Sequence, residues 1–249
     1  MLLHLQAQDV LSVKQYSTAI ASDNWSNLYV ITPDNTLLKY NSEAQPIASF
    51  SPRDGSRIEN VDAGNPFKII LKLQSENPLL VIDNRLAAIS SAQVHAFPKD
   101  TREFLFCTAP TGGIRIYSPE NSRLMKFNDS YEIEYERNLG ELPDNIIKIA
   151  ATSSFIFFQD NNERLYIFNS GTGSVHPLEK FRVKDFCTYQ EEVLFFAPED
   201  DRIRVYNPEK RTVADFYTFS EKKKLKHIAR SSSFVFYTDE ERIYFRKLK

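Results

Sequence analysis

Short apolar runs, separated by polar turn residues, recur at near-regular spacing along the whole chain. Six strongly apolar runs lie at residues 28–31, 67–71, 104–107, 155–158, 193–196 and 234–237. A second apolar run follows each of them, at residues 37–40, 79–82, 114–117, 165–168, 203–206 and 243–246. The last residues of these second runs are 42, 35, 51, 38 and 40 positions apart, which indicates a repeat of about 40 residues.

The segments between the runs have the composition of tight turns. Residues 33–35 (Pro-Asp-Asn) and 160–163 (Asp-Asn-Asn-Glu) each separate a first run from a second one. After a second run, Asn207 followed by Pro208 suits a type I turn, because proline fixes φ while the short polar side chain caps the bend. Consecutive runs are therefore predicted to be antiparallel hairpin strands. Leading and trailing strands, such as residues 147–150 and 212–216, bring a copy to four strands.

Four strands in about 40 residues, repeated along the chain, predict an all-β fold of the β-propeller type. Six copies predict six blades, and the irregular second and third copies leave five or seven blades open; residues 128–145 are expected to form an insertion. The central runs are apolar on both faces, as expected for blades that are covered by neighbours on both sides. The sixth copy ends at its third strand, so the spare segment 10–16 is expected to complete that blade and close the ring.

We expect a single propeller domain over residues 9–249, and we expect it to be a monomer on its own. The composition agrees with such a domain. Aromatic residues make up 13% of the chain, with 19 Phe and 12 Tyr, which favours packed β-structure. The formal net charge of −2 argues against nucleic-acid binding. Cys107 and Cys187 lie in apolar stretches and are predicted to be buried thiols. No stretch of about 18 apolar residues is present, so no direct membrane insertion is expected.

Residues 1–8 resemble the tail of a secretory signal peptide. They are rich in leucine and place the small residue Ala7 before Gln8, although His4 interrupts the apolar stretch. Such a remnant predicts a periplasmic protein. The alternative is an ordinary N-terminal strand, which would leave the protein cytoplasmic.

Motifs that mark a catalytic centre are absent from the sequence. The four histidines lie in separate segments without metal-ligand spacing, and neither a glycine-rich phosphate loop nor a nucleophile elbow is present. We therefore expect no catalytic residue, no cofactor and no metal. The enzymatic alternative is a metal-dependent hydrolase or lactonase with its site in the propeller channel. Its candidate ligands occupy non-equivalent positions in their copies: Asp23, Asp62, Asp83 and Asp185.

Two groups of loop residues are candidates for binding a protein. Asp160, Asp200 and Asp239 lie in equivalent hairpin turns, where an acidic rim would either favour solubility or attract a basic partner. Trp25, the only tryptophan, and Asn65 lie in loops predicted on the opposite face. An exposed tryptophan there would form a protein-binding hot spot or a small-ligand or glycan contact, whereas an inward one would pack on its own blade.

The repeat resembles the WD40, NHL and YVTN group of β-propellers in period and strand layout, although the Trp-Asp dipeptide of WD40 repeats is absent. Residues 23–30, 61–71 and 80–84 also resemble small exported propeller proteins that accompany the type IX secretion translocon of Gram-negative bacteria. That resemblance implies a plug-like accessory subunit that docks on an outer-membrane translocon without catalysis. We therefore expect a non-catalytic protein-interaction module of a cell-envelope complex.

Overall fold

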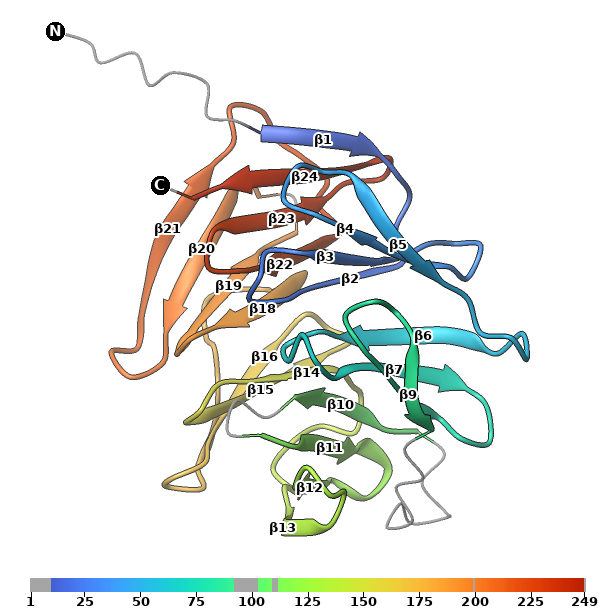
Figure 1. The fold of residues 1–249 in the computed structure, drawn as a ribbon. Helices are drawn as coiled ribbons and strands as arrows, with labels where there is room; N and C mark the ends of the chain where they lie inside the picture. Colours follow the sequence, from blue (N-terminus) through green and yellow to red (C-terminus); the bar gives the residue numbers. More distant parts are fainter. Residues whose placement is uncertain (1–9, 92–102, 109–111, 199, 249) are drawn as a thin grey trace, which may run out of the picture. The chain divides into compact units, whose positions relative to one another are not determined.

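The computed structural model describes residues 10–91, 103–108, 112–198 and 200–248 of the chain, so the predicted signal-peptide remnant at residues 1–8 lies outside the described residues. They form six four-stranded antiparallel sheets, which are the six blades of a β-propeller (Figure 1). One short 3₁₀ turn, η1 (Pro119–Asn121), interrupts the strands. Among the described residues, no helix has the length and apolar composition that a bilayer-spanning segment requires.

The blades fall into two compact units of three blades each. The first blade of the first unit consists of β2 (Ala19–Ser22), β3 (Leu28–Ile31), β4 (Leu37–Tyr40) and β5 (Pro46–Phe50). Its second blade consists of β6 (Arg57–Asp62), β7 (Ile69–Gln74), β8 (Leu79–Ile82) and β9 (Ala88–Ser91). Its third blade consists of β22 (His227–Arg230), β23 (Phe234–Thr238), β24 (Arg242–Lys247) and β1 (Val10–Lys14). Within this unit the first strand β2 lies against the first strands β22 and β6 of the other two blades.

The second unit contains the three blades from the middle of the chain. The first of them consists of β10 (Leu105–Thr108), β11 (Ile114–Ser118), β12 (Arg123–Phe127) and β13 (Ile133–Asn138). The second consists of β14 (Ile146–Ala151), β15 (Phe155–Asp160), β16 (Leu165–Asn169) and β17 (Val175–Pro177). The third consists of β18 (Asp185–Tyr189), β19 (Glu192–Phe196), β20 (Arg202–Asn207) and β21 (Thr212–Thr218). Within this unit β14 lies against β10 and β18.

The N-terminal strand completes the last blade, as the sequence predicted. β1 pairs with β24 in antiparallel register, from Val10 opposite Arg246 to Lys14 opposite Arg242. Figure 1 shows the two strands side by side, one from each end of the chain. The side chain of Val13 also packs on the apolar cluster that contains Phe236. Strand pairing and side-chain burial therefore both anchor the N-terminal segment.

The third copy departs from the prediction in its strand order. Residues 104–107 and 114–117 were expected as the second and third strands of a blade, but they form its first and second strands, β10 and β11. Residues 128–145 are not an insertion, because they include the fourth strand β13. With β12 as the third strand, third strands end 42, 45, 42, 38 and 40 residues apart, which is more regular than the apolar runs suggested. All six residues of β13 are exposed, so this strand has no continuous apolar run by which the sequence could reveal it.

The core lies between the blades, because the central strands bury both of their faces. Every residue of β3, β11, β15 and β23 is buried. Tyr29 and Leu37 pack against Leu71 and Ile82 of the next blade, and Phe157 packs against Phe186 with ring centroids 6.5 Å apart. Hydrophobic burial at about 25 cal/mol per Å² makes these inter-blade faces the main source of stability.

Candidate functional site

The loop that carries Trp25 is organised around one buried carboxylate. Asp23 is 1% exposed, and its Oδ1 accepts hydrogen bonds of 2.9 Å from the backbone amides of Trp25 and Asn27. Its Oδ2 accepts hydrogen bonds from Asn27 Nδ2 at 2.8 Å and from Tyr29 Oη at 2.9 Å. Ser26 takes the left-handed conformation, with φ of 64°, and closes the turn. Asp23 therefore fixes the backbone on which the indole stands.

Trp25 points outward and meets an aromatic ring from the next blade. Its side chain is 49% exposed, and Phe67, in the loop between β6 and β7, is 64% exposed. The two rings pack edge to face, with centroids 5.0 Å apart and planes at 88°. Asn65 stabilises the loop between β6 and β7, because its Oδ1 accepts a hydrogen bond of 3.0 Å from the backbone amide of Phe67. Neither ring is buried by the unit to which it belongs.

A third loop, between β22 and β23, supports this aromatic pair. Ser26 Oγ and Ser231 Oγ form a buried hydrogen bond of 3.0 Å, and Ser22 Oγ donates to the carbonyl of Arg230 at 2.8 Å. Three blades of the first unit thus contribute one continuous surface. We call it the Trp25–Phe67 patch, and it consists of Asn24, Trp25, Asn65, Phe67, Ser232 and Ser233.

The electrostatics beneath the patch are those of a buried, satisfied network. Burial raises the pKa of Tyr29, and the adjacent Asp23 carboxylate raises it further. Burial lowers the pKa of Lys39, although the carboxylates of Asp23 and Asp83 act in the opposite direction. Lys39 Nζ donates a hydrogen bond of 2.8 Å to the carbonyl of Asn84. These groups stabilise the fold through their hydrogen bonds. None of the six residues of the Trp25–Phe67 patch has a charged side chain.

Asp160, a predicted member of the acidic rim, is used by its own hairpin. It is 1% exposed, and its Oδ1 accepts hydrogen bonds from the amides of Asn162 at 2.9 Å and Arg164 at 2.8 Å. Glu163 completes the turn in the left-handed conformation, with φ of 64°. The carboxylate therefore stabilises the turn and presents little charge to solvent.

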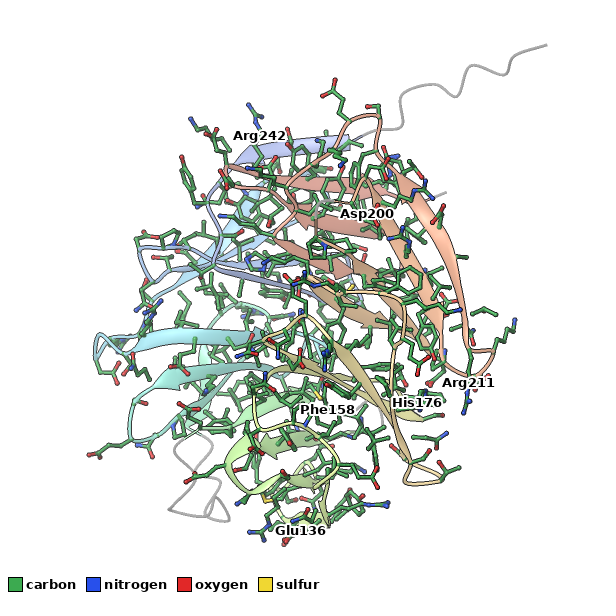
Figure 2. The ribbon with its side chains drawn as sticks, turned by 180° about the vertical axis from the view of Figure 1, so that it is seen from behind. Glu136, Phe158, His176, Asp200, Arg211 and Arg242 are labelled. Atoms are coloured by element: carbon green, nitrogen blue, oxygen red, sulfur yellow. The ribbon has the colours of Figure 1, made fainter. Side chains whose placement is uncertain are left out.

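The other two predicted acids also have partners nearby. Asp200, which is labelled in Figure 2, forms a short ion pair with Arg204, and both side chains are largely buried. Asp239 Oδ1 accepts hydrogen bonds from the amides of Glu241 at 3.0 Å and Arg242 at 2.9 Å, and its Oδ2 accepts one of 2.7 Å from Tyr244 Oη. Each acid mainly forms hydrogen bonds or an ion pair with groups of its own blade. This weakens the argument for an acidic rim that attracts a basic partner.

The aspartates proposed for a channel metal have separate structural roles. Asp62 and Asp83 accept hydrogen bonds of 2.8 Å from the amides of Gly64 and Arg85 in their own turns. Asp185 forms a short ion pair with Lys148. Within the described residues, no group of three or more His, Cys, Asp or Glu side chains is arranged to hold a metal ion.

Phe67 is the functional candidate that sequence reasoning missed. It opens the apolar run at residues 67–71 and was therefore assigned to a strand, but β7 begins at Ile69. The signal was the dipeptide Asn65-Pro66 directly before it, because asparagine followed by proline favours a turn. Pro66 is buried and Phe67 follows it outward, so the ring belongs to the loop.

Comparison with solved structures shows the fold. The WD40 domain of Neurospora crassa Pan2 aligns with a TM-score of 0.63 and 10% identity, covering 98% of this chain and 98% of that one. Virginiamycin B lyase from Staphylococcus aureus aligns with a TM-score of 0.61 and 10% identity, covering 98% of this chain and 100% of that one. The Cps50 (Swd1) β-propeller domain of Myceliophteria thermophila aligns with a TM-score of 0.54 and 10% identity, covering 93% and 83%.

The fold is a WD40-like β-propeller. At about 10% identity the likeness shows the fold alone, and these neighbours include a WD40 domain as well as a lyase. No protein-family model matches the sequence, and no curated protein matches it significantly. The function must therefore be argued from the side chains of this chain.

Proposed function

We propose that the protein is a non-catalytic docking module that binds a protein partner through the Trp25–Phe67 patch. The observation that carries this proposal is the exposed edge-to-face pair of Trp25 and Phe67 on hydrogen-bonded loops. Tryptophan is enriched among residues that dominate binding energy. Burying a large apolar side chain contributes about 1.5–3 kcal/mol, and loops that are already rigid lose little entropy on binding.

The chemistry of the patch defines the partner surface. The loops that carry and support the two rings also present the polar, uncharged side chains of Asn24, Asn65 and Ser232, as is typical of an interface with an apolar centre and a polar rim. We infer a near-neutral partner surface with an apolar projection that fits beside the rings. Binding at such a surface depends weakly on salt, whereas docking through Asp200 or Asp239 would weaken as salt screens the charges.

We further propose that the partner belongs to a cell-envelope complex and that the protein is periplasmic. The support for this is the resemblance of residues 23–30 and 61–71 to propellers that accompany the type IX translocon. Both loops of the aromatic pair lie in or beside these segments. An outer-membrane translocon is therefore the partner to test first.

Affinity purification of a C-terminally tagged protein from native cells in mild detergent tests the proposal. We expect a stoichiometric envelope protein that is retained when the salt concentration is raised. Trp25→Ser combined with Phe67→Ser should lose this partner, while Ile147→Ser, which alters a side chain of comparable exposure in another blade, should keep it. A partner that the double variant retains, or one that salt releases, would contradict docking at this patch.

A further inference from the structure

The second unit contains a hollow that the docking proposal does not use. It has a volume of about 780 Å³ and lies between the blade of β14–β17 and the blade of β18–β21. Small-molecule sites in proteins have volumes of about 300–1,000 Å³. Most of its lining side chains are polar, and they include Ser154, Asn169, Thr172, Ser174, His176 and Arg211.

The walls of this pocket are held in place by hydrogen bonds between loops. The amide of Ser170 donates to the carbonyl of Ser154 at 2.9 Å. Glu191, from the neighbouring blade, accepts hydrogen bonds from the amides of Ser153 at 3.0 Å and Ser154 at 3.3 Å. Burial acts to raise the pKa of Glu191, but the hydrogen bonds outweigh it and leave the pKa below its usual value. The charged Glu191 thus clamps two blades together behind the pocket.

Two basic side chains meet at the pocket. His176 lies on β17 and Arg211 in the turn after β20, and Figure 2 shows them beside each other. The Nε2 atom of His176 is shielded from solvent and has no hydrogen-bond partner among the described residues. Arg211 is exposed and makes no ion pair within the described part of the chain. Its backbone takes the left-handed conformation, with φ of 54°.

The remaining polar groups suit a ligand that carries hydroxyl groups. Thr172 Oγ1 and Ser174 Oγ form a hydrogen bond of 2.8 Å, and each hydroxyl has further donor or acceptor capacity. Glu209 also lines the pocket and offers carboxylate acceptors. Hydroxyls, an amide and one carboxylate around a basic pair can satisfy both the anionic and the hydroxyl groups of one molecule.

We propose that this pocket binds a small anionic sugar, whose carboxylate or phosphate is held between Arg211 and His176 while its hydroxyls face Thr172, Ser174 and Glu209. The planar guanidinium of Arg211 can donate two parallel hydrogen bonds to either anion. The anion would also give His176 Nε2 the hydrogen-bond partner that it otherwise lacks.

The proposal predicts how binding depends on pH. Burial lowers the pKa of His176, and the charge of Arg211 lowers it further. A bound anion favours the protonated imidazole, so binding raises this pKa and takes up a proton. Glu209 and Glu191 face the same region from the neighbouring blade, and Arg137 reaches its rim through a hydrogen bond of 3.1 Å to the carbonyl of Gly173. The affinity should therefore increase as the pH falls from 8 to 6.

Isothermal titration calorimetry of the whole protein tests this site with four probes: glucuronate, glucose 6-phosphate, glucose and inorganic phosphate. We expect at least one of the two charged sugars to bind, and their relative affinities to tell whether the pocket prefers a carboxylate or a phosphate. Glucose should not bind, and phosphate should bind more weakly than the preferred sugar. Failure of both charged sugars to bind at millimolar concentration would overturn the proposal, as would phosphate that binds as tightly as the sugars.

Matched variants locate the binding in the pocket. Arg211→Gln should weaken affinity on the order of tenfold or more, because it removes a charge-assisted pair of hydrogen bonds. Lys210→Gln removes the same charge from the adjacent residue, whose side chain is exposed and lies outside the pocket lining. This variant should leave the affinity unchanged. His176→Gln should abolish the increase in affinity between pH 8 and 6. Equal affinities of Arg211→Gln and Lys210→Gln, with melting temperatures like that of the wild type, would place the binding elsewhere.

Discussion

The rings of Trp25 and Phe67 meet edge to face, 5.0 Å apart, although they stand on loops of different blades. Each ring is about half exposed or more, at 49% and 64%. The hydrogen bonds to Asp23 and Asn65 show that the loops beneath them are fixed. An aromatic pair that is rigidly presented but not buried by its own unit is a feature of binding surfaces, and we base the functional proposal on it.

Removal of the Asp23 carboxylate should destabilise the protein. Asp23→Ala leaves the amides of Trp25 and Asn27 and the hydroxyl of Tyr29 without their acceptor in a buried setting. We expect the free energy of unfolding to fall by about 3 kcal/mol. Urea denaturation measures this loss, and Asp54→Ala, at an exposed turn, serves as the control. A loss in Asp23→Ala no larger than in Asp54→Ala would show that the carboxylate does not organise the loop.

Alkaline pH should destabilise the last blade through Tyr244. Burial and the 2.7 Å hydrogen bond to Asp239 raise the pKa of Tyr244 from its ordinary value of 10.0 to about 12. Because the unfolded chain loses this proton first, stability falls as the pH rises from 10 to 12. Tyr244→Phe should make the free energy of unfolding fall less steeply over this window. An identical pH dependence in the wild type and the variant would refute the assignment.

The N-terminal strand should make a large contribution to thermal stability. A chain that begins at Gln15 lacks β1 and exposes the edge of β24. We expect its melting temperature to fall by about 5–10 °C, since a domain of this size loses about 2–4 °C for each kcal/mol. Val13→Asp should have a similar but smaller effect, whereas Val10→Asp, at an exposed position, should not. An unchanged melting curve for the truncated chain would contradict the role of β1.

The two thiols should react at different rates. Cys107 is 3% exposed, as the sequence predicted, but Cys187 is only partly buried, so the prediction of two buried thiols is wrong for this residue. A disulfide reagent should label Cys187 in the folded protein well before Cys107. Cys187→Ser identifies the fast phase by removing it. Equal labelling rates would show that the two sites are equally accessible.

The repeat could be predicted from the sequence because inter-blade burial makes the central strands apolar on both faces. Runs such as residues 155–158 therefore stand out from their polar turns. The outer strands do not, because an exposed edge strand such as β13 has no continuous apolar run: Ile133 and Tyr135 alternate with glutamates and all six residues are exposed. This is why residues 128–145 looked like an insertion, and why the third copy was assigned one strand out of step.

The candidate site was predicted only in part. Trp25 was recognised because a tryptophan in a polar turn is unusual, and Asn65 because it lies in an equivalent loop. Phe67 was not recognised, because its contact with Trp25 depends on packing between blades. The acidic turns looked like an exposed rim, but Asp160 is buried under the hydrogen bonds of its own hairpin. Whether a turn carboxylate points to solvent or to backbone amides is a matter of geometry that sequence alone does not show.

Photo-crosslinking in native cells tests the central claim most directly. A benzoyl-phenylalanine in place of Phe67 puts a short-range crosslinker in the Trp25–Phe67 patch, and the same residue in place of Ile147 provides the control on another blade. We predict a discrete crosslinked adduct with one protein at position 67, none at position 147, and loss of the adduct when Trp25→Ser is added. No adduct at position 67, or the same adduct at both positions, would show that this patch is not the docking surface.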